Sequence, residues 1–328
     1  MAERPVPTAS DVSCAFWEAT RNGQLLLQHD PQTGRSQFFP RAVSVFSEAE
    51  PEWRPTAGTG RLIAVTTCRV AAPGFEAPYL VGIVQLDEGP RVFARLLNTG
   101  PELAVAQRQG ALANPNACDT FKRPLTEADY LGSRMIADPI RMLDCVMRCD
   151  GANAVIVTTT ERARRLGVKR LAHPLAYREI TNFDPRQEID DITVSGFTVS
   201  GPGALRDAGI APADIDMFQP YDDFLIAVIL QLEQIGFAPT GGGGDFILAH
   251  DISYRGDFPI NTGGGQISAG QPGLAGGGVN LTEAVTQLLG QAGERQAPKR
   301  RTSLVTGIGA MQYARNWGTS AALVLEAG

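Results

Sequence analysis

The residue pattern of this 328-residue chain changes near Asn98, and the change limits the folds that are possible. Residues 1–100 contain short runs of β-branched and aromatic residues between Gly and Pro clusters, a pattern that predicts an all-β barrel or sandwich. Residues 101–328 alternate strand-like and helical runs, which predicts an α/β layer structure. The length also fits about two domains. We therefore expect one domain over 1–100 and another over 101–328.

The elements expected in each part follow from these runs. In the first part the pattern predicts a helix over 10–22 and strands over 25–30, 36–46, 60–71, 79–87 and 91–98. A helical, polar stretch over 101–150 follows, with Cys145 and Cys149 spaced as on one buried helix face. Beyond it the pattern predicts strands over 153–160, 176–184, 214–221, 301–309 and 320–327, and helices over 161–167, 201–210, 223–237 and 281–292.

Composition and charge disfavour several functional classes. The net charge is −6, whereas a nucleic-acid-binding protein needs a basic surface to neutralise phosphates. No apolar run approaches the roughly 18 residues of a membrane helix, and the N-terminus has no apolar core of a secretion signal. Five scattered cysteines suit a reducing compartment, so we expect a cytoplasmic protein.

A glycine-rich stretch, NTGGGQISAGQPGLAGGG (261–278), carries no charged residue. It could be a linker, a phosphate-binding loop or an active-site loop. Phosphate binding is disfavoured because the GxxxxGK[ST] arrangement and its lysine are absent. A linker is disfavoured because structured segments are expected on both sides. An active-site loop is the interpretation that remains.

Six segments together resemble the thiolase superfamily, in particular its lipid-transfer (sterol-carrier) branch. They are LAVAQRQGALANPNA (103–117), SRMIADPIRMLDC (133–145), DGANAVIVTTTERARRLG (150–167), IDMFQPYDDF (215–224), NTGGGQISAGQPG (261–273) and VTGIGAMQ (305–312). The resemblance covers about 105–328 and implies a partial thiolase-like fold. The half that bears the nucleophile in thiolases has no counterpart here, which implies exposed apolar faces and an oligomer.

Residues 1–98 resemble the OB-fold domain that partners thiolases in acyl-CoA metabolism, usually behind a zinc ribbon. The resemblance is carried by FW (16–17), GQLLLQ (23–28), TGRSQFFPR (33–41), EW (52–53) and GTGRLIAVT (58–66). At the four places of the ribbon cysteines stand Asp30, Thr33, Ser44 and Ser47. Structural zinc needs Cys or His ligands, so we expect no metal site.

The resemblance also shows which thiolase groups are replaced. Gln271 occupies the place of the histidine that activates the nucleophile, and glutamine cannot take a proton. Thr306 lies near the place of the second cysteine. No strand–cysteine–helix context precedes residue 103, and we expect the cysteines to be structural. Thiolytic catalysis by this chain alone is therefore not expected.

Some members of the lipid-transfer branch lack the cysteine and resemble retro-aldolases of steroid side-chain CoA esters. Such chemistry needs proton transfer and enolate stabilisation but no covalent nucleophile. We predict Tyr221, Asp222, Tyr313 and Gln271 as catalytic residues. The predicted substrate-binding residues are Asn261, Gly264, Gly265, Gln266, Ser268, Gly270 and Gly309.

The resemblance implies an acyl-CoA-handling protein of lipid metabolism, of acyltransferase or lyase type. It would use Claisen or retro-aldol chemistry within an oligomer, with a thiolase-like or OB-fold subunit or a second copy as partner. The alternative is a catalytically inactive acyl-CoA-binding or scaffold subunit of a thiolase complex. No cofactor is implied besides the coenzyme A of the substrate. We expect no membrane and no nucleic acid as partner, because the OB-like part lacks a basic-aromatic pattern.

Overall fold

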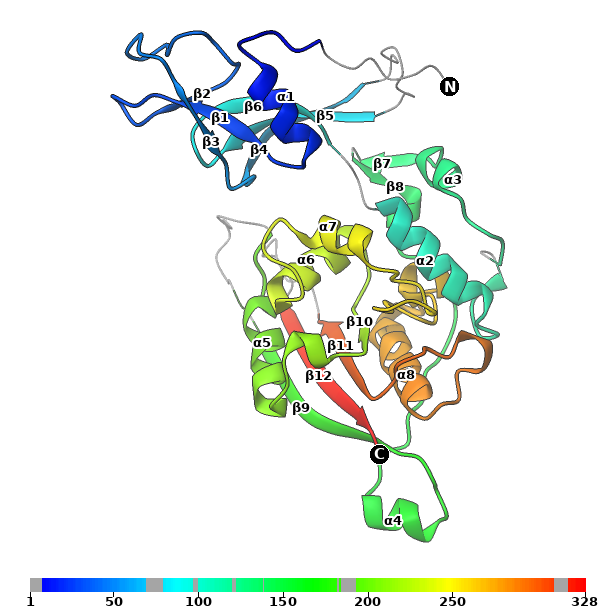
Figure 1. The fold of residues 1–328 in the computed structure, drawn as a ribbon. Coiled ribbons are helices and arrows are strands. Elements are labelled where there is room, and N and C mark those ends of the chain that lie inside the picture. Colours follow the sequence, from blue (N-terminus) through cyan, green and yellow to red (C-terminus); the bar gives the residue numbers. More distant parts are fainter. Residues whose placement is uncertain are drawn as a thin grey trace. The chain divides into compact units, whose positions relative to one another are not determined.

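The chain forms two compact units, residues 1–97 and 98–328, in a computed structural model (Figure 1). The structure describes residues 8–68, 79–96, 100–119, 122–137, 139–181, 183, 193–309 and 318–328. None of the helices in these ranges combines the length and the apolar character that a membrane span requires.

The described residues of the first unit form one helix and two three-stranded antiparallel sheets. The helix is α1 (Cys14–Arg21), and one sheet has the order β2-β1-β3, with β1 (Leu26–His29), β2 (Ser36–Gln37) and β3 (Glu52–Pro55). The other is the meander β4 (Gly60–Cys68), β5 (Tyr79–Leu86) and β6 (Arg91–Leu96). The all-β character is as predicted. Within the described ranges, however, the two sheets are not joined by a ladder into a closed barrel.

The strand predicted over 36–46 is wrong for most of its length, because its chain wraps around the carboxylate of Asp30. Asp30 is only 1% exposed, and its Oδ1 accepts the backbone N–H groups of Gln32 (2.8 Å) and Thr33 (2.9 Å). Its Oδ2 accepts the hydroxyls of Ser44 and Ser47. The four positions aligned with the zinc ribbon therefore meet around one carboxylate. In the described ranges no three His, Cys, Asp or Glu side chains gather as metal ligands.

Asp30→Asn is expected to remove an acid-sensitive part of the first unit's stability. Burial alone would raise the pKa of Asp30, but the hydrogen bonds from Ser44, Ser47, Thr33 and Gln32 outweigh it and hold the pKa well below its usual range. A lowered folded pKa stabilises above the unfolded value of about 3.9, and this stability is lost as the pH falls below it.

Thermal unfolding followed by circular dichroism at pH 7 and pH 3 measures this effect. The wild type should lose more stability between the two pH values than Asp30→Asn. The exposed Asp11→Asn serves as control and should behave as wild type. An Asp30→Asn variant with the same melting temperature as the wild type at both pH values contradicts the role given to this carboxylate.

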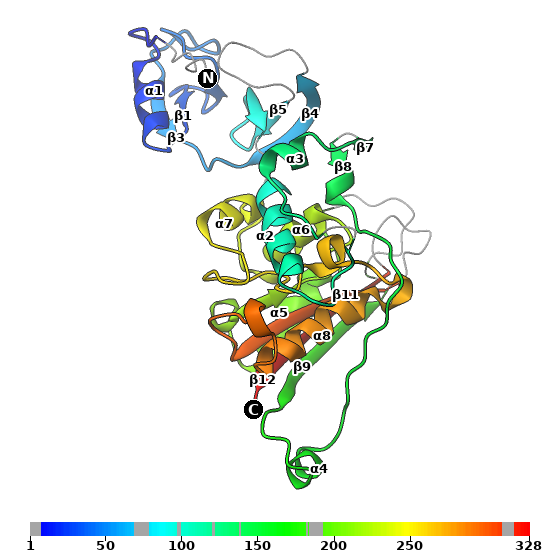
Figure 2. The same ribbon diagram turned by 90° about the vertical axis from the view of Figure 1, so that its right-hand side faces the viewer.

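The second unit is built on a four-stranded sheet of order β10-β11-β12-β9 (Figure 2). Its strands are β9 (Ala172–Thr181), β10 (Met217–Gln219), β11 (Thr302–Ile308) and β12 (Thr319–Ala327). Only β10 and β11 are parallel, while β12 runs antiparallel to both neighbours. The predicted strands over 176–184, 214–221, 301–309 and 320–327 correspond to these four elements with shifted ends.

Helices cover both faces of this sheet, because successive strand residues point to opposite sides. Phe218 and Leu304 join the core beneath α5 (Phe197–Ala208) and α6 (Leu225–Ile235), whereas Met217 and Val305 join the core beneath α8 (Gly276–Leu288). The α/β layering predicted for residues 101–328 is thus present. The remaining elements are α2 (Gly100–Leu112), α3 (Glu127–Leu131), β7 (Met135–Ala137), β8 (Ile140–Arg141), η2 (Met142–Asp144), α4 (Thr160–Arg165), η3 (Pro212–Asp214), α7 (Gly243–Ala249), η4 (Gly265–Ala269), η5 (Gly273–Ala275) and η6 (Gly293–Arg295).

Two further predictions for this unit are wrong. Residues 153–159, the body of the strand predicted over 153–160, are extended but belong to no sheet. Cys145 and Cys149 do not share a helix, because the segment after η2 pairs in an extended form. Cys145 bridges to Phe224, and Arg148 bridges to Gln271. That pairing brings the 145–149 segment against the glycine-rich loop.

Candidate active site

The glycine-rich loop turns into the short π-helix η4 through backbone angles that few residues adopt. Gly264 and Gly265 have φ angles of 100° and 57°, and Asn261 has 47°. At Gly265 there is also no space for a side chain, since an added Cβ would lie 2.2 Å from Oδ2 of Asp222. Glycine is therefore required here both by conformation and by the approach of the carboxylate.

Asp222 anchors this π-helix. Its carboxylate is completely buried and accepts the backbone N–H groups of Gln266 (3.0 Å) and Ile267 (3.3 Å). Burial raises the pKa of Asp222 to about 7, although these hydrogen bonds oppose the shift. Both oxygens hold the loop, so the geometry of Asp222 is that of a positioning group.

The backbone of Tyr221 is fixed by two buried side chains from other elements. Its N–H donates to Oγ1 of Thr306 at 2.9 Å, and its carbonyl oxygen accepts from Nε2 of Gln231 at 2.8 Å. The Thr306 hydroxyl in turn donates to Gln231. Thr306, which stands near the place of a thiolase cysteine, therefore serves to position Tyr221.

The phenol of Tyr221 meets two amide side chains of the loop. Nε2 of Gln271 lies 3.5 Å from the Tyr221 hydroxyl and 3.1 Å from Oε1 of Gln266. Burial raises the pKa of Tyr221, and the charge of Asp223 adds to the shift. The phenol consequently keeps its proton near neutral pH and can donate it.

Asp223 is a carboxylate that the sequence analysis did not nominate. It is half-buried, and its Oδ1 accepts the N–H of Phe224 at 3.0 Å. Burial raises the pKa of Asp223 to about 6. At neutral pH most of this group is therefore ionised, while its proton affinity is higher than that of an exposed aspartate.

Asn280 of α8 connects the loop to the Tyr221 segment. Its Nδ2 donates to Oδ1 of Asn261 at 3.0 Å and to the carbonyl oxygen of Pro220. Four buried amide atoms nearby have no hydrogen-bond partner within the described part of the chain. They are Nδ2 of Asn261, Nε2 of Gln266, Oε1 of Gln219 and Oδ1 of Asn280. Unpaired buried amides of this kind are available to a polar ligand.

A cavity of about 700 Å³ lies beside the loop, inside the second unit. Asn261, Gly265 and Gly270 line it from the loop, and Gln219 and Asn280 reach it from β10 and α8. Residues 114–119 and 149–154 form the other side. Three of the unpaired amides therefore belong to residues that line one cavity.

A buried ion pair stiffens the wall of this cavity. Glu283 and Arg295 are each less than a tenth exposed and are joined at 2.9 Å. The same carboxylate accepts the hydroxyl of Thr262 at 2.8 Å and Nε2 of Gln287 at 2.9 Å. Since Thr262 belongs to the glycine-rich loop, the pair ties the loop to α8 and η6.

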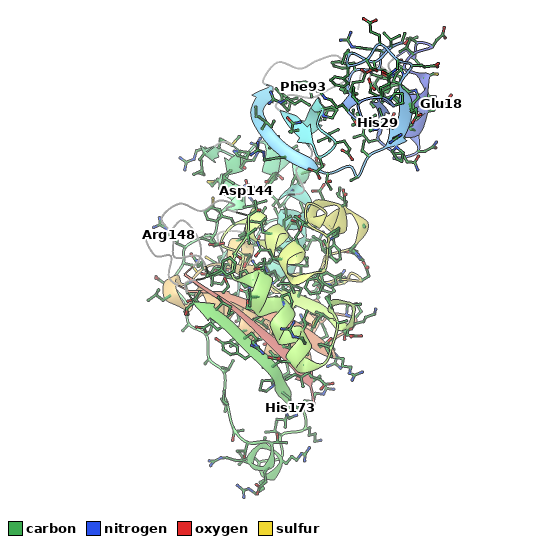
Figure 3. All side chains as sticks on the ribbon, turned by 90° about the vertical axis from the view of Figure 1, so that its left-hand side faces the viewer. Glu18, His29, Phe93, Asp144, Arg148 and His173 are labelled. Carbon is green, nitrogen blue, oxygen red and sulfur yellow. The ribbon has the colours of Figure 1, made fainter. Side chains whose placement is uncertain are left out.

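The described residues place neither a histidine nor a reactive thiol against Tyr221. Figure 3 shows His173 at one end of the second unit and Arg148, the backbone partner of Gln271, toward the other. His250 pairs with Asp257 at 2.6 Å on the side of α7, and His29 lies in the first unit. Burial raises the pKa of the Cys149 thiol beside Gly270, which disfavours its nucleophilic form.

Most of the predicted site residues meet around the loop, and a few lie elsewhere. Ser268 is buried and receives a 3.5 Å hydrogen bond from Nε of Arg108. Gly309 follows β11 and donates its N–H to the carbonyl oxygen of Thr319, without a contact to the Tyr221 cluster. Tyr313 lies outside the described residues. The residues brought together are Tyr221, Asp222, Asn261, Gly264, Gly265, Gln266, Gly270 and Gln271.

Two protein families match the two parts of the chain. Residues 183–321 match the family described as "Thiolase C-terminal domain-like", and residues 53–108 match "ChsH2, C-terminal OB-fold domain". The chain joins a ChsH2-type OB-fold domain to a thiolase C-terminal-like domain. The resemblance inferred from the motifs is thus confirmed for both domains.

Relatives of the thiolase-like domain include two steroid-degrading enzymes. The 17-hydroxy-3-oxo-4-pregnene-20-carboxyl-CoA lyase of Mycobacterium tuberculosis is 33% identical over 219 residues, 63% of this chain and 54% of that protein. The steroid side-chain-cleaving aldolase of Thermomonospora curvata is 34% identical over 213 residues, which are 58% of this chain and 52% of that protein. The chain therefore spans about half the length of these relatives.

A solved structure is also similar to the chain. The structure titled "Ltp2-ChsH2(DUF35) aldolase" aligns with a TM-score of 0.57 and 28% identity, over 70% of this chain and 58% of that chain. The thiolase-like domain described above thus has a counterpart in an enzyme named for aldol chemistry.

Proposed function

We propose that the chain is a lyase subunit that cleaves a 3-hydroxyacyl-CoA thioester by retro-aldol chemistry within an oligomeric complex. The observation that carries this proposal is the Tyr221 cluster. It brings the protonated phenol of the segment after β10 against the amide side chains of the glycine-rich loop, and among the described residues neither a thiol nor a histidine contacts that phenol. The relatives' names, a lyase of a CoA ester and an aldolase, support the same reaction class.

The reaction balances without an oxidant, a reductant or a covalent enzyme intermediate. A base removes the proton of the 3-hydroxyl, the bond between C2 and C3 breaks, and C3 becomes the carbonyl carbon of an aldehyde or ketone. The electron pair passes to the thioester as an enolate, which is then protonated at C2. In the proposed assignment Asp223 is the base and the Tyr221 phenol is the acid.

The loop amides are suited to the charge that develops in this reaction. Nδ2 of Asn261 and Nε2 of Gln266 are buried donors without a partner among the described atoms. Neutral donors fixed in advance stabilise an enolate oxygen better than water that must reorient. Asp222 supports them indirectly, since its carboxylate holds the backbone from which Gln266 projects.

The reaction is tested by incubating the purified chain with a panel of 3-hydroxyacyl-CoA thioesters, including branched and steroid side chains. The expected result is release of an aldehyde or ketone together with the shortened acyl-CoA.

The alternative is a catalytically inactive subunit that binds acyl-CoA or a thiolase partner. It is favoured by one observation, namely that both oxygens of the strongly shifted Asp222 are occupied by backbone N–H groups. Binding of a non-cleaved acyl-CoA by isothermal titration, with no carbonyl product from any thioester of the panel, is the result expected for this alternative.

A further inference from the structure

Residues 152–158 (ANAVIVT) form an extended segment that pairs with no strand in the described part of the chain. Asn153 attaches its start to α8, donating to the carbonyl oxygen of Ala275 at 3.1 Å and accepting from Thr282 at 3.1 Å. Beyond this point Ile156 is 96% exposed and Val157 90% exposed. Figure 2 shows the stretch running to α4 with no strand beside it.

Both faces of this segment are apolar. Successive side chains of an extended segment point to opposite sides, so Val155 and Val157 occupy one face and Ala154 and Ile156 the other. A strand that is apolar on both faces is typical of sheets covered by helices on each side. Its backbone amides from 154 to 158 donate no hydrogen bond within the described part of the chain. The segment therefore matches a strand of a layered α/β sheet, separated from that sheet.

A basic helix follows the apolar segment. We name residues 152–170 the strand–helix arm. Between 161 and 170 the only acidic residue is Glu161, and five side chains are basic and exposed. The basic residues are Arg162, Arg164, Arg165, Lys169 and Arg170. The net charge of the chain is −6, so this local excess of positive charge stands out. It favours a partner whose surface is acidic next to the apolar contact.

In a second copy of the chain, the free edge of β9 is poorly suited to accept this strand. The free edge of β9 contains Pro174, which has no N–H to donate, and the charged residues Arg178 and Glu179. Such residues are typical of edges that resist strand addition. Pairing of two arms with each other would give a two-stranded ribbon whose apolar faces stay uncovered.

We propose that the strand–helix arm adds its residues 152–158 as a strand to the open edge of a separate α/β polypeptide that is acidic beside that edge. The similar lyase and aldolase contain about as much chain again as the part matched here, which is the size of a layered domain. The inference rests on the proposed function in one respect: Gly151–Ala154 also line the cavity, so the partner would complete its wall.

The proposal is tested by co-expressing the full chain with that part of the Thermomonospora curvata aldolase to which no residues of this chain correspond. We expect a one-to-one complex in which the amides of 152–158 exchange with deuterium at least about tenfold more slowly than in the free chain. Ile156→Asp should abolish the complex without changing the melting temperature of the free chain, because the side chain is exposed there. Leu248→Asp, which replaces a 53% exposed residue of α7, is the matched control and should retain it.

Several results overturn the proposal. The first is a partner region that stays insoluble or separate in the presence of the wild-type chain. The second is a complex in which the 152–158 amides exchange as fast as in the free chain. The third is a complex that Ile156→Asp yields in the same amount as the wild-type chain. Light scattering that shows a homodimer lost in Ile156→Asp also overturns it, as does arm-dependent binding to vesicles of anionic phospholipid. None of these measurements involves turnover, so the result is independent of whether the lyase activity exists.

Discussion

Tyr221→Phe is expected to lower kcat/KM for cleavage of a 3-hydroxyacyl-CoA by about 10²–10⁴-fold, the range typical of a lost proton-transfer group. The substitution removes only the hydroxyl, which contacts the amide side chains of Gln271 (3.5 Å) and Gln266. The backbone contacts to Thr306 and Gln231 remain. The melting temperature should therefore stay within about one degree of wild type, because the contact to Gln271 is long and Gln266 keeps its hydrogen bond to Gln271.

Tyr177→Phe is the matched control for this variant. Tyr177 is 57% exposed on β9, and its hydroxyl contacts Glu179 instead of the loop. We expect wild-type kinetics for Tyr177→Phe on the same substrate. If Tyr221→Phe cleaves as fast as this control, the phenol of Tyr221 has no part in the reaction and the proposed acid is wrong.

Arg295→Met is expected to destabilise the thiolase-like unit by about 3–5 kcal/mol, because it leaves a buried carboxylate without its counter-charge. Glu283 would keep only the neutral donors Thr262 and Gln287. Loss of the pair should also loosen the glycine-rich loop, since Thr262 belongs to it. Urea unfolding followed by circular dichroism measures the change in the free energy of unfolding.

Two comparisons make this prediction specific. Arg301→Met breaks an exposed pair with Glu326 and should change the free energy of unfolding by less than about 1 kcal/mol. The double variant Glu283→Gln/Arg295→Met should recover part of the loss, because no buried charge remains. A double variant that is destabilised relative to the wild type by the sum of the effects of Glu283→Gln alone and Arg295→Met alone would indicate that the charges do not interact.

The sequence predicted the order of elements well where periodicity reflects the chain's own core. The apolar spacing over 223–237 and 301–309 became α6 and β11, which lie in the centre of the thiolase-like unit. The strand over 153–160 was predicted from equally clear apolar character but has no sheet to join. Apolar periodicity indicates that a segment is suited to burial. It does not indicate whether the burying surface belongs to the same polypeptide or to another one.

The candidate site was predicted from local motifs and missed where its residues are distant in sequence. YDDF and the glycine-rich loop stood out as stretches, and the structure brings Tyr221 to within 3.5 Å of Gln271. Asn280 and Glu283 were missed because the helix was predicted over 281–292 without a role for its polar residues, whereas α8 begins at Gly276 and includes both. A usable signal was present, since the polar residues 280, 283 and 287 follow one helical face that packs on the loop.

The Asp30 cluster illustrates another limit of motif comparison. The replaced cysteine positions predicted the loss of zinc, but not that one carboxylate would accept hydrogen bonds from all three other positions. The geometry depends on the folding of residues 30–47 around Asp30. Stoichiometric zinc in the purified chain would contradict the expected absence of a metal site.

Product analysis with and without free coenzyme A shows whether carbon–carbon cleavage proceeds without a thiol nucleophile. The 3-hydroxyacyl-CoA that reacts in the panel is incubated with the purified chain, and the carbonyl product and the shortened acyl-CoA are quantified by mass spectrometry. We predict equal amounts of both products, formed at the same rate whether or not free coenzyme A is added. Cleavage that requires added coenzyme A, or acyl transfer to a cysteine of this chain, would contradict the account.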